Sequence, residues 1–187
     1  MSGNHASGSR RDRLIREAVE RHGVLDTDMV QLMFFRGMST GRRGAQHRLK
    51  ILCDKGYLRR ARESFDQPFY YFVGKMSGQL EHRLGVNWVY LWLLLSLKSW
   101  ETLHCFDYEI DYKVLRADAF AAVKNKVNKE RPFKFYYVEF DRAESGNKFD
   151  KFDKYTGLFQ SERYMEYYTW WLPLADRFPA VIIIHEL

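Results

Sequence analysis

Residues 38–74, MSTGRRGAQHRLKILCDKGYLRRARESFDQPFYYFVG, decide the predicted fold of the first part of the chain. Ser39 is a suitable helix N-cap, and Gly56 is a typical residue just after a helix end. Between them, apolar residues recur at three- and four-residue intervals: Ala45, Leu49, Leu52 and Cys53. Beyond Gly56, two extended runs flank a polar turn that contains Pro68. The segment therefore predicts a helix followed by a β-hairpin.

Two further helical patterns precede this segment. Residues 10–22 have helical apolar spacing that ends at Gly23. A shorter helix follows Asp26 or Thr27, either of which is a suitable cap, and ends near Gly37. Three helices followed by a hairpin is the order of a winged helix-turn-helix, so we expect this architecture for residues 10–75. Residues 1–9 are small and polar, and we expect a disordered tail there.

Polar and basic side chains mark one outward edge of the third helix and the first arm of the hairpin. Guanidinium, ammonium, amide and imidazole groups are the usual readers of base edges and phosphates, and a winged helix presents them to duplex DNA. The predicted DNA-binding residues are Thr40, Arg42, Arg43, Gln46, His47, Lys50, Arg59, Arg60 and Arg62. The alternative for the same residues is a solvated basic face without a nucleic-acid partner.

The charge distribution favours the DNA-binding interpretation. The whole chain carries a formal charge of +6, and residues 1–75 contain 15 Lys and Arg against 8 Asp and Glu. The excess positive charge therefore lies in the first part, where clustered cations can neutralise phosphates. The content of 46% hydrophobic and 17% aromatic residues excludes a largely disordered chain.

Residues 76–187 predict a second, α/β domain, so the chain as a whole is expected to be α+β. We expect a buried helix from Asn87, a possible N-cap, to Phe106, strands over 112–123 and 133–141, and a fully buried strand at 179–187. An amphipathic helix is expected over 146–164, with one apolar stripe formed by Phe149, Phe152, Tyr155 and Phe159. The apolar run 86–97 is shorter than the roughly 20 residues that span a bilayer, so no membrane partner is expected. Cys53 and Cys105 lie in separate runs that indicate buried helices, and no signal-peptide pattern is visible. We therefore expect a reduced, cytoplasmic protein.

A set of acidic residues in this second part raises the possibility of catalysis. Asp118 closes one predicted strand, and Glu139 and Asp141 share a face of the next. Hard oxygen ligands suit Mg²⁺, which can activate water for attack on a phosphodiester. Under this hypothesis Asp118 and Glu139 hold the metal, Asp141 assists, and Lys151 or Lys154 orients the water. Otherwise we expect no cofactor.

The structural alternative assigns the same acids to ion pairs that hold the sheet to its helix. Their candidate basic partners are Arg116, Arg142, Lys151 and Lys154. In either case the arrangement resembles the PD-(D/E)XK nuclease core in degenerate form. Ala117 replaces the proline of that pattern, and Asp141 stands where its lysine is expected.

A wider resemblance extends from about Arg10 to the last strand. The segments that carry it are RLKILCDKGYLRR, EHRLGVNW, SWE, RADA, YYVEFDRAES and KFDKYTGLF, in this order. Together they resemble the replication-relaxation family of plasmid and phage proteins. The resemblance implies a DNA-binding protein that acts in replication, relaxation, mobilisation or transcription control. A homodimer and a replication, transfer or transcription protein are the further partners we expect. A metal-dependent DNA nickase and a module that binds a host factor remain alternatives.

Overall fold

The computed structural model describes residues 3–76, 78–141, 151–166, 170–175 and 177–185. The chain divides into two compact units, Met1–Trp88 and Val89–Leu187. The division falls inside helix α4 (Leu80–Ser96), rather than at the composition change after residue 75. The first half of α4 belongs to the first unit because Asn87 is buried there and donates from Nδ2 to the carbonyl oxygen of Val24 at 2.6 Å. Asn87 is therefore a buried hydrogen-bond donor inside α4 and not the helix cap that we predicted.

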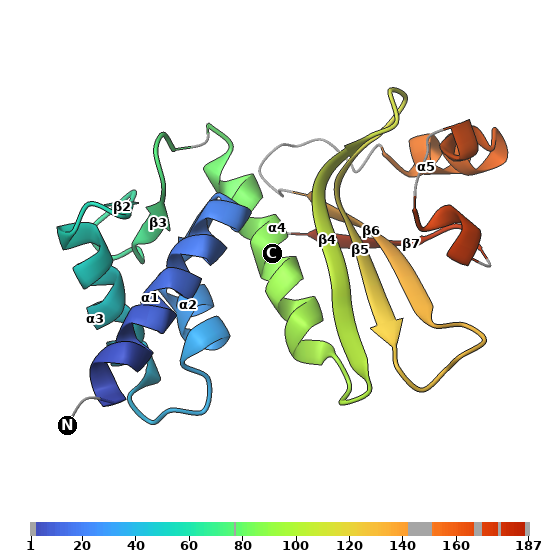
Figure 1. Cartoon of the computed structure of the whole chain (residues 1–187). Helices are drawn as coiled ribbons and strands as arrows, with labels where there is room; N and C mark the ends of the chain where they lie inside the picture. The colour runs from blue at the N-terminus through green and yellow to red at the C-terminus, as the bar shows by residue number, and fades with distance from the viewer. Residues whose placement is uncertain (1–2, 77, 142–150, 167–169, 176, 186–187) are drawn as a thin grey trace. The chain divides into compact units, whose positions relative to one another are not determined.

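The first unit contains three helices and a small antiparallel sheet (Figure 1). Its elements follow the chain as α1 (Gly3–His22), β1 (Val24–Asp26), α2 (Thr27–Phe34), α3 (Gly41–Asp54), β2 (Arg59–Ala61) and β3 (Tyr70–Phe72). The strands are ordered β1-β3-β2, with Val24 opposite Phe72 and Arg60 opposite Tyr71. The helix–helix–helix–hairpin order is as predicted, but β1 is an additional strand. The first helix begins at Gly3, so the backbone of residues 3–9 continues α1 instead of forming the expected tail.

Local signals explain where α2 and α3 begin and end. The Asp26 carboxylate accepts a hydrogen bond from the Met29 amide at 2.7 Å and caps α2 as predicted. Gly56, just after α3, has a φ of +72°, a left-handed conformation that few other residues adopt at low cost. Thr40, and not Ser39, takes the N-cap position of α3, without a side-chain cap hydrogen bond. The buried residues of α3 include Ala45, Leu49 and Leu52, in agreement with the helical pattern.

The second unit is built on a four-stranded sheet in the order β4-β5-β6-β7 (Figure 1). Its elements after α4 are β4 (Glu101–Asp111), β5 (Arg116–Asn125), β6 (Phe133–Asp141), α5 (Lys151–Gln160), two short 3₁₀ helices (Arg163–Glu166 and Leu172–Leu174) and β7 (Ala180–His185). Strands β4, β5 and β6 are antiparallel, and β7 runs parallel to β6 with Val138 opposite Ile182. The chain is therefore α+β with two sheets.

The structure corrects two predictions for this unit. The helix predicted to reach Phe106 ends at Ser96, and Cys105 lies half-buried in strand β4. Along β4, Phe106 is buried and its two neighbours are more exposed, which is the two-residue period of a strand. The apolar run before β4 concealed this period in the sequence. Strand β7 is an edge strand of the described sheet, and its Ile184 is 37% exposed, so this strand is not fully buried.

The core of the second unit is aromatic. Tyr112, Phe120, Tyr137 and Trp171 pack there, and the Tyr137 hydroxyl donates to the Tyr112 hydroxyl at 2.7 Å. Helix α5 contributes Tyr155 and Leu158 to this core, whereas Phe152 and Phe159, predicted on its inner stripe, are 67% and 52% exposed. Phe149 lies outside the described residues.

No helix among the described residues combines the length and apolar character needed to cross a membrane.

Candidate functional site

A polar groove of about 510 Å³ lies between α3 and the β2–β3 hairpin of the first unit. The predicted DNA-binding residues that line it are Arg42, Gln46, Lys50, Arg60 and Arg62. The other lining residues are Thr27, Asp28, Asp66, Gln67, Pro68, Phe69 and Tyr71. Side chains that come from separate parts of the sequence therefore share one surface.

Helix geometry explains which α3 residues line the groove. Arg42, Gln46 and Lys50 are four residues apart and follow one edge of the helix. Arg43 and His47 are exposed and each follows a lining residue by one position, so they lie on the neighbouring edge. Thr40 and Arg59 are also exposed, but neither lines the groove.

Acidic residues moderate the positive charge of the groove. Arg42 pairs with Asp28 at 3.4 Å, and Lys50 pairs with Asp54 at 2.6 Å. Both cations are 62% exposed, so these pairs contribute little to stability and can exchange partners. By contrast, Arg48 donates from Nε to Asp12 at 2.7 Å and joins α3 to α1. Arg48 therefore has a structural role.

The hairpin holds its arginines by aromatic contacts. The Arg60 guanidinium lies over the Phe69 ring, 4.7 Å from its centroid, and Arg62 lies 4.7 Å from the same ring. Arg62 also lies 4.3 Å from the centroid of Phe65. Sequence reasoning identified the arginines but not these two phenylalanines. The available signal was that Phe65 and Phe69 follow the arginines of the first arm closely, in and just after the turn.

The predicted acidic residues of the second unit lie in an ionic cluster formed by Asp118, Glu139, Lys151 and Tyr155. Asp118 on β5 comes just before Ala119, and Glu139 on β6 comes just after its partner Val138, so the two acids lie on neighbouring strands at the same level. Lys151 on α5 hydrogen-bonds both of them, reaching Asp118 Oδ1 at 3.1 Å and Glu139 Oε2. The Tyr155 hydroxyl donates to Glu139 Oε1 at 2.5 Å. Two strands and a helix are therefore joined by one set of charges.

Burial dominates the protonation behaviour of this cluster. Glu139 is only 1% exposed, and this burial, followed by the charge of Asp118, raises its pKa to about 7 against the opposing effects of Lys151 and Tyr155. Burial alone would lower the pKa of Lys151, but the two carboxylates outweigh it and raise that pKa. Burial and the neighbouring Glu139 also raise the pKa of Tyr155. Glu139 thus gains or loses its proton near neutral pH.

A divalent cation does not fit this cluster as it is arranged. The Lys151 ammonium contacts both carboxylates from the position where a bridging cation would have to bind, and Tyr155 engages the second oxygen of Glu139. The remaining Asp118 oxygen accepts the Phe140 amide at 2.8 Å. Across the residues that the structure describes, no group of three or more His, Cys, Asp or Glu could hold a metal ion.

The other two predicted catalytic residues, Asp141 and Lys154, lie close to the cluster in sequence. Asp141 is half-buried at the end of β6, in register with His185. Lys154 is exposed on α5, three residues after Lys151. The contacts of Lys151 join Asp118 and Glu139.

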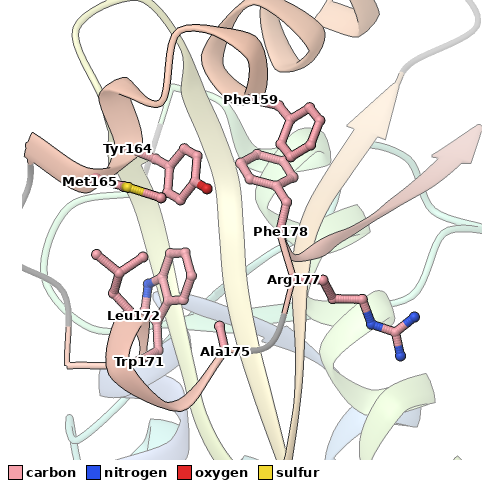
Figure 2. Close-up of a pocket in the computed structure, with 8 residues that line it drawn as sticks. All are labelled: Phe159, Tyr164, Met165, Trp171, Leu172, Ala175, Arg177 and Phe178. Atoms are coloured by element: carbon pink, nitrogen blue, oxygen red, sulfur yellow. The ribbon is translucent and has the colours of Figure 1, made fainter.

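A separate, apolar pocket of about 560 Å³ lies on the second unit (Figure 2). Phe159 and Phe178 form one side and Trp171 and Tyr164 another, whereas Arg177 points away from the aromatic rings. Trp171 is 3% exposed and stacks on Tyr164 at an interplanar angle of 11°. Apart from the exposed Phe159, these rings belong to the aromatic core or pack against it, and the described lining offers no polar set that would define a ligand.

Comparison with known proteins identifies the family. No curated protein and no solved structure matches the chain. A family model described as replication-relaxation matches residues 73–170, just over half of the 187 residues. The match includes all of α4, the strands β4 to β6 and α5, and hence the whole ionic cluster. The chain belongs to the replication-relaxation family.

Proposed function

We propose that the first unit is a winged helix-turn-helix that binds duplex DNA in the replication, relaxation or mobilisation of a plasmid or phage, or in control of its transcription. The element order α1-β1-α2-α3-β2-β3 and the sheet order β1-β3-β2 support this proposal. Family membership supports the biological context. The observation that carries the proposal is the single groove lined by both α3 and the hairpin.

In this proposal the two sides of the groove contact different parts of DNA. Helix α3 enters the major groove, where Gln46 can pair with an adenine edge and Arg42 or Arg43 with a guanine edge. Arg60 and Arg62 on the hairpin neutralise phosphates, assisted by the exposed Arg59. The pairs Arg42–Asp28 and Lys50–Asp54 exchange their carboxylates for phosphates or bases on binding.

The second unit is then a non-catalytic platform in the same proposal. The ionic cluster attaches α5 to the sheet, because the Lys151 ammonium on α5 contacts carboxylates on β5 and β6. Dimer formation or recruitment of a replication, transfer or transcription protein is the role we assign to this unit. A twofold dimer would require a palindromic DNA site.

The decisive experiment is selection of bound duplexes from random DNA, followed by footprinting at two salt concentrations. Recovery of a shared sequence, with binding that weakens at the higher salt, is the expected result. Lys129→Ala, an exposed change in the second unit, is the matched control and should leave binding unchanged. If no duplex is retained even at low salt, the DNA-binding proposal fails and a module for a host protein becomes the better hypothesis.

A supercoiled-plasmid assay separates this proposal from a metal-dependent nickase. Because Lys151 occupies the position between the carboxylates, we expect no nicked product with Mg²⁺ or Mn²⁺. Metal-dependent nicking that disappears in Glu139→Gln would replace the platform assignment with the enzyme.

A further inference from the structure

Three aromatic rings from distant parts of the second unit form a cluster at its surface. They are His104 on β4, Phe133 at the start of β6 and Trp170, two residues before the second 3₁₀ helix. The ring centroids are 5.2 Å apart for His104 and Phe133, 5.1 Å for His104 and Trp170, and 5.8 Å for Phe133 and Trp170. His104 is exposed and Trp170 is 38% exposed, so this aromatic cluster faces water.

The core of the unit holds the aromatic cluster in place. Phe133 is half-buried and packs against the core, and the Trp170 ring lies 6.0 Å from that of the core residue Phe135. Aromatic side chains fixed in this way lose little conformational entropy when they bind a planar group. The exposed parts of the rings are therefore suited to stacking.

A basic turn adjoins the aromatic cluster. Residues 124–134, which include the β5–β6 turn, contain five Lys and Arg against one Glu. Lys124, Lys126 and Lys129 are exposed there, and Lys124 Nζ lies 5.7 Å from the centroid of Phe133. Two asparagine side chains accept hydrogen bonds from backbone amides of the turn at 2.9 to 3.1 Å, which gives the turn a defined shape. Rings and cations therefore share one surface.

The combination of flat rings and cations fits a single nucleic-acid strand. Unpaired bases stack on aromatic side chains, and neighbouring cations follow the phosphates of the strand. A duplex keeps its bases stacked inside the helix, where the rings of the aromatic cluster cannot reach their faces. The carboxylates of an acidic peptide would satisfy the lysines but would offer no planar ring to Trp170.

We propose that the aromatic cluster and the basic turn bind single-stranded DNA, with Trp170 and His104 stacking on bases and Lys124 and Lys126 contacting phosphates. The inference goes beyond the proposed duplex binding, because it assigns a second nucleic-acid surface to the second unit and does not require the groove of the first. Replication and mobilisation both separate DNA strands and so provide the partner that this surface needs.

Fluorescence anisotropy of a labelled oligothymidylate of about 15 nucleotides, titrated with the full chain, tests the contact. Trp170→Ala should weaken binding about tenfold, the scale of losing one aromatic–base stack, and leave the slope of log affinity against log salt unchanged. Trp170→Phe, which keeps a ring, should retain most of the affinity. Lys124→Gln with Lys126→Gln should instead reduce the magnitude of the slope by about 1.4, because each phosphate contact on a single strand contributes about 0.7.

An abasic strand of the same length separates stacking from charge without any substitution. It keeps the phosphates but lacks the bases, so the wild-type chain should bind it at least about tenfold more weakly than oligothymidylate, and Trp170→Ala should cause no further loss. Phe152→Ala is the matched control. Its ring is 67% exposed and lies in a groove with Ile183, whose partner Glu139 is six residues along β6 from Phe133. This change should affect neither strand.

The outcomes separate this inference from the proposed function. Wild-type affinity for oligothymidylate in Trp170→Ala, or equal affinity of the wild-type chain for the abasic strand, would overturn the stacking surface. Equal displacement of oligothymidylate by polyglutamate would overturn it as well, by reducing the surface to a general attraction for anions. Trp170-dependent binding of single strands by a chain that retains no duplex would reject the proposed function and uphold this inference.

Discussion

Lys151 shows how one residue decides the interpretation of the acidic cluster. Its position thirty-three residues after Asp118 and twelve after Glu139 gives no local signal that it contacts both. In the structure its ammonium satisfies the two carboxylates, and Tyr155 satisfies Glu139 from one turn further along α5. An ammonium at this position supplies charge neutralisation without the Lewis acidity of a metal ion.

Removing the Lys151 cation should destabilise the second unit. Lys151→Met leaves Glu139 and Asp118 as neighbouring acids without their shared counter-ion, at a cost of about 3 kcal/mol. Urea unfolding with hydrogen exchange of the β5 and β6 amides measures this loss. The same change in an Asp118→Asn, Glu139→Gln background should cost much less. Lys129→Met, an exposed change in the same unit, is the control, and an equal loss there would contradict the ionic account.

His22 should make the first unit sensitive to acid. Burial, with the nearby charges of Arg21 and Arg83, lowers the pKa of His22 from 6.5 to about 4. The unfolded chain therefore binds a proton below pH 6.5 that the folded chain does not bind until about pH 4. The free energy of unfolding should fall across this interval by up to about 3 kcal/mol, because each unit of pKa shift corresponds to about 1.4 kcal/mol.

Denaturant titrations at several pH values test the His22 prediction. The loss attributed to His22 is absent above pH 6.5 and complete below about pH 4. In His22→Gln, which lacks a titrating ring, the decrease between these values should shrink, whatever the absolute stability of the variant. An unchanged pH dependence in His22→Gln would assign the acid sensitivity to other groups.

At the scale of elements, α3 and the hairpin should have separable roles. Arg43→Ala with Gln46→Ala removes groups of the kind that read base edges, and should reduce the preference for the selected site over random duplex. Arg60→Ala removes a phosphate contact from the hairpin and should weaken all duplexes by similar factors. Competition binding on selected and scrambled duplexes measures both effects. Full site preference in the α3 double variant would contradict the major-groove assignment.

The elements also show which local patterns are reliable. The α3 pattern of Ala45, Leu49 and Leu52 was confirmed because a helix with one buried face has its period encoded within a few turns. Strand β4 was missed because apolar and aromatic residues continue from the preceding helix into the strand. The two-residue alternation of β4 was therefore not recognised where the helix ends and the strand begins. Strand β1 was missed because it has only three residues, and its partner β3 is far along the chain.

At the scale of the whole molecule, positive charge is concentrated in the first unit, and binding should depend on salt accordingly. Four basic side chains line the groove: Arg42, Lys50, Arg60 and Arg62. Release of counter-ions at four phosphates predicts a slope of log affinity against log salt of about −3 to −4. Because Arg42 and Lys50 already pair with acidic residues, we expect a slope nearer −3 than −4. Fluorescence anisotropy with a labelled duplex measures this slope.

Charge changes in the second unit provide the control for that measurement. Lys126→Gln with Lys129→Gln removes two exposed cations from the β5–β6 turn and should leave the slope unchanged. A slope that responds equally to these changes and to Arg60→Ala would indicate non-specific attraction by the entire chain instead of the groove.

The sequence by itself determined the features that depend on neighbours along the chain. These include the α3 helix and its polar edge, the following hairpin, the extent of β6 and the uneven distribution of charge. The family resemblance, which the match over residues 73–170 confirmed, was likewise contained in the order of short motifs. Periodicity, capping and charge density act over a few residues, so a single sequence is enough to detect them.

Only the tertiary structure decided which distant side chains meet. It brought Arg60 and Arg62 to the same groove as α3, and it placed Lys151 between Asp118 and Glu139. It also divided the chain inside α4, where Asn87 joins the helix to the start of β1. These contacts depend on strand register and on the direction in which a helix crosses a sheet, and both are set by the packing of the whole unit rather than by adjacent residues.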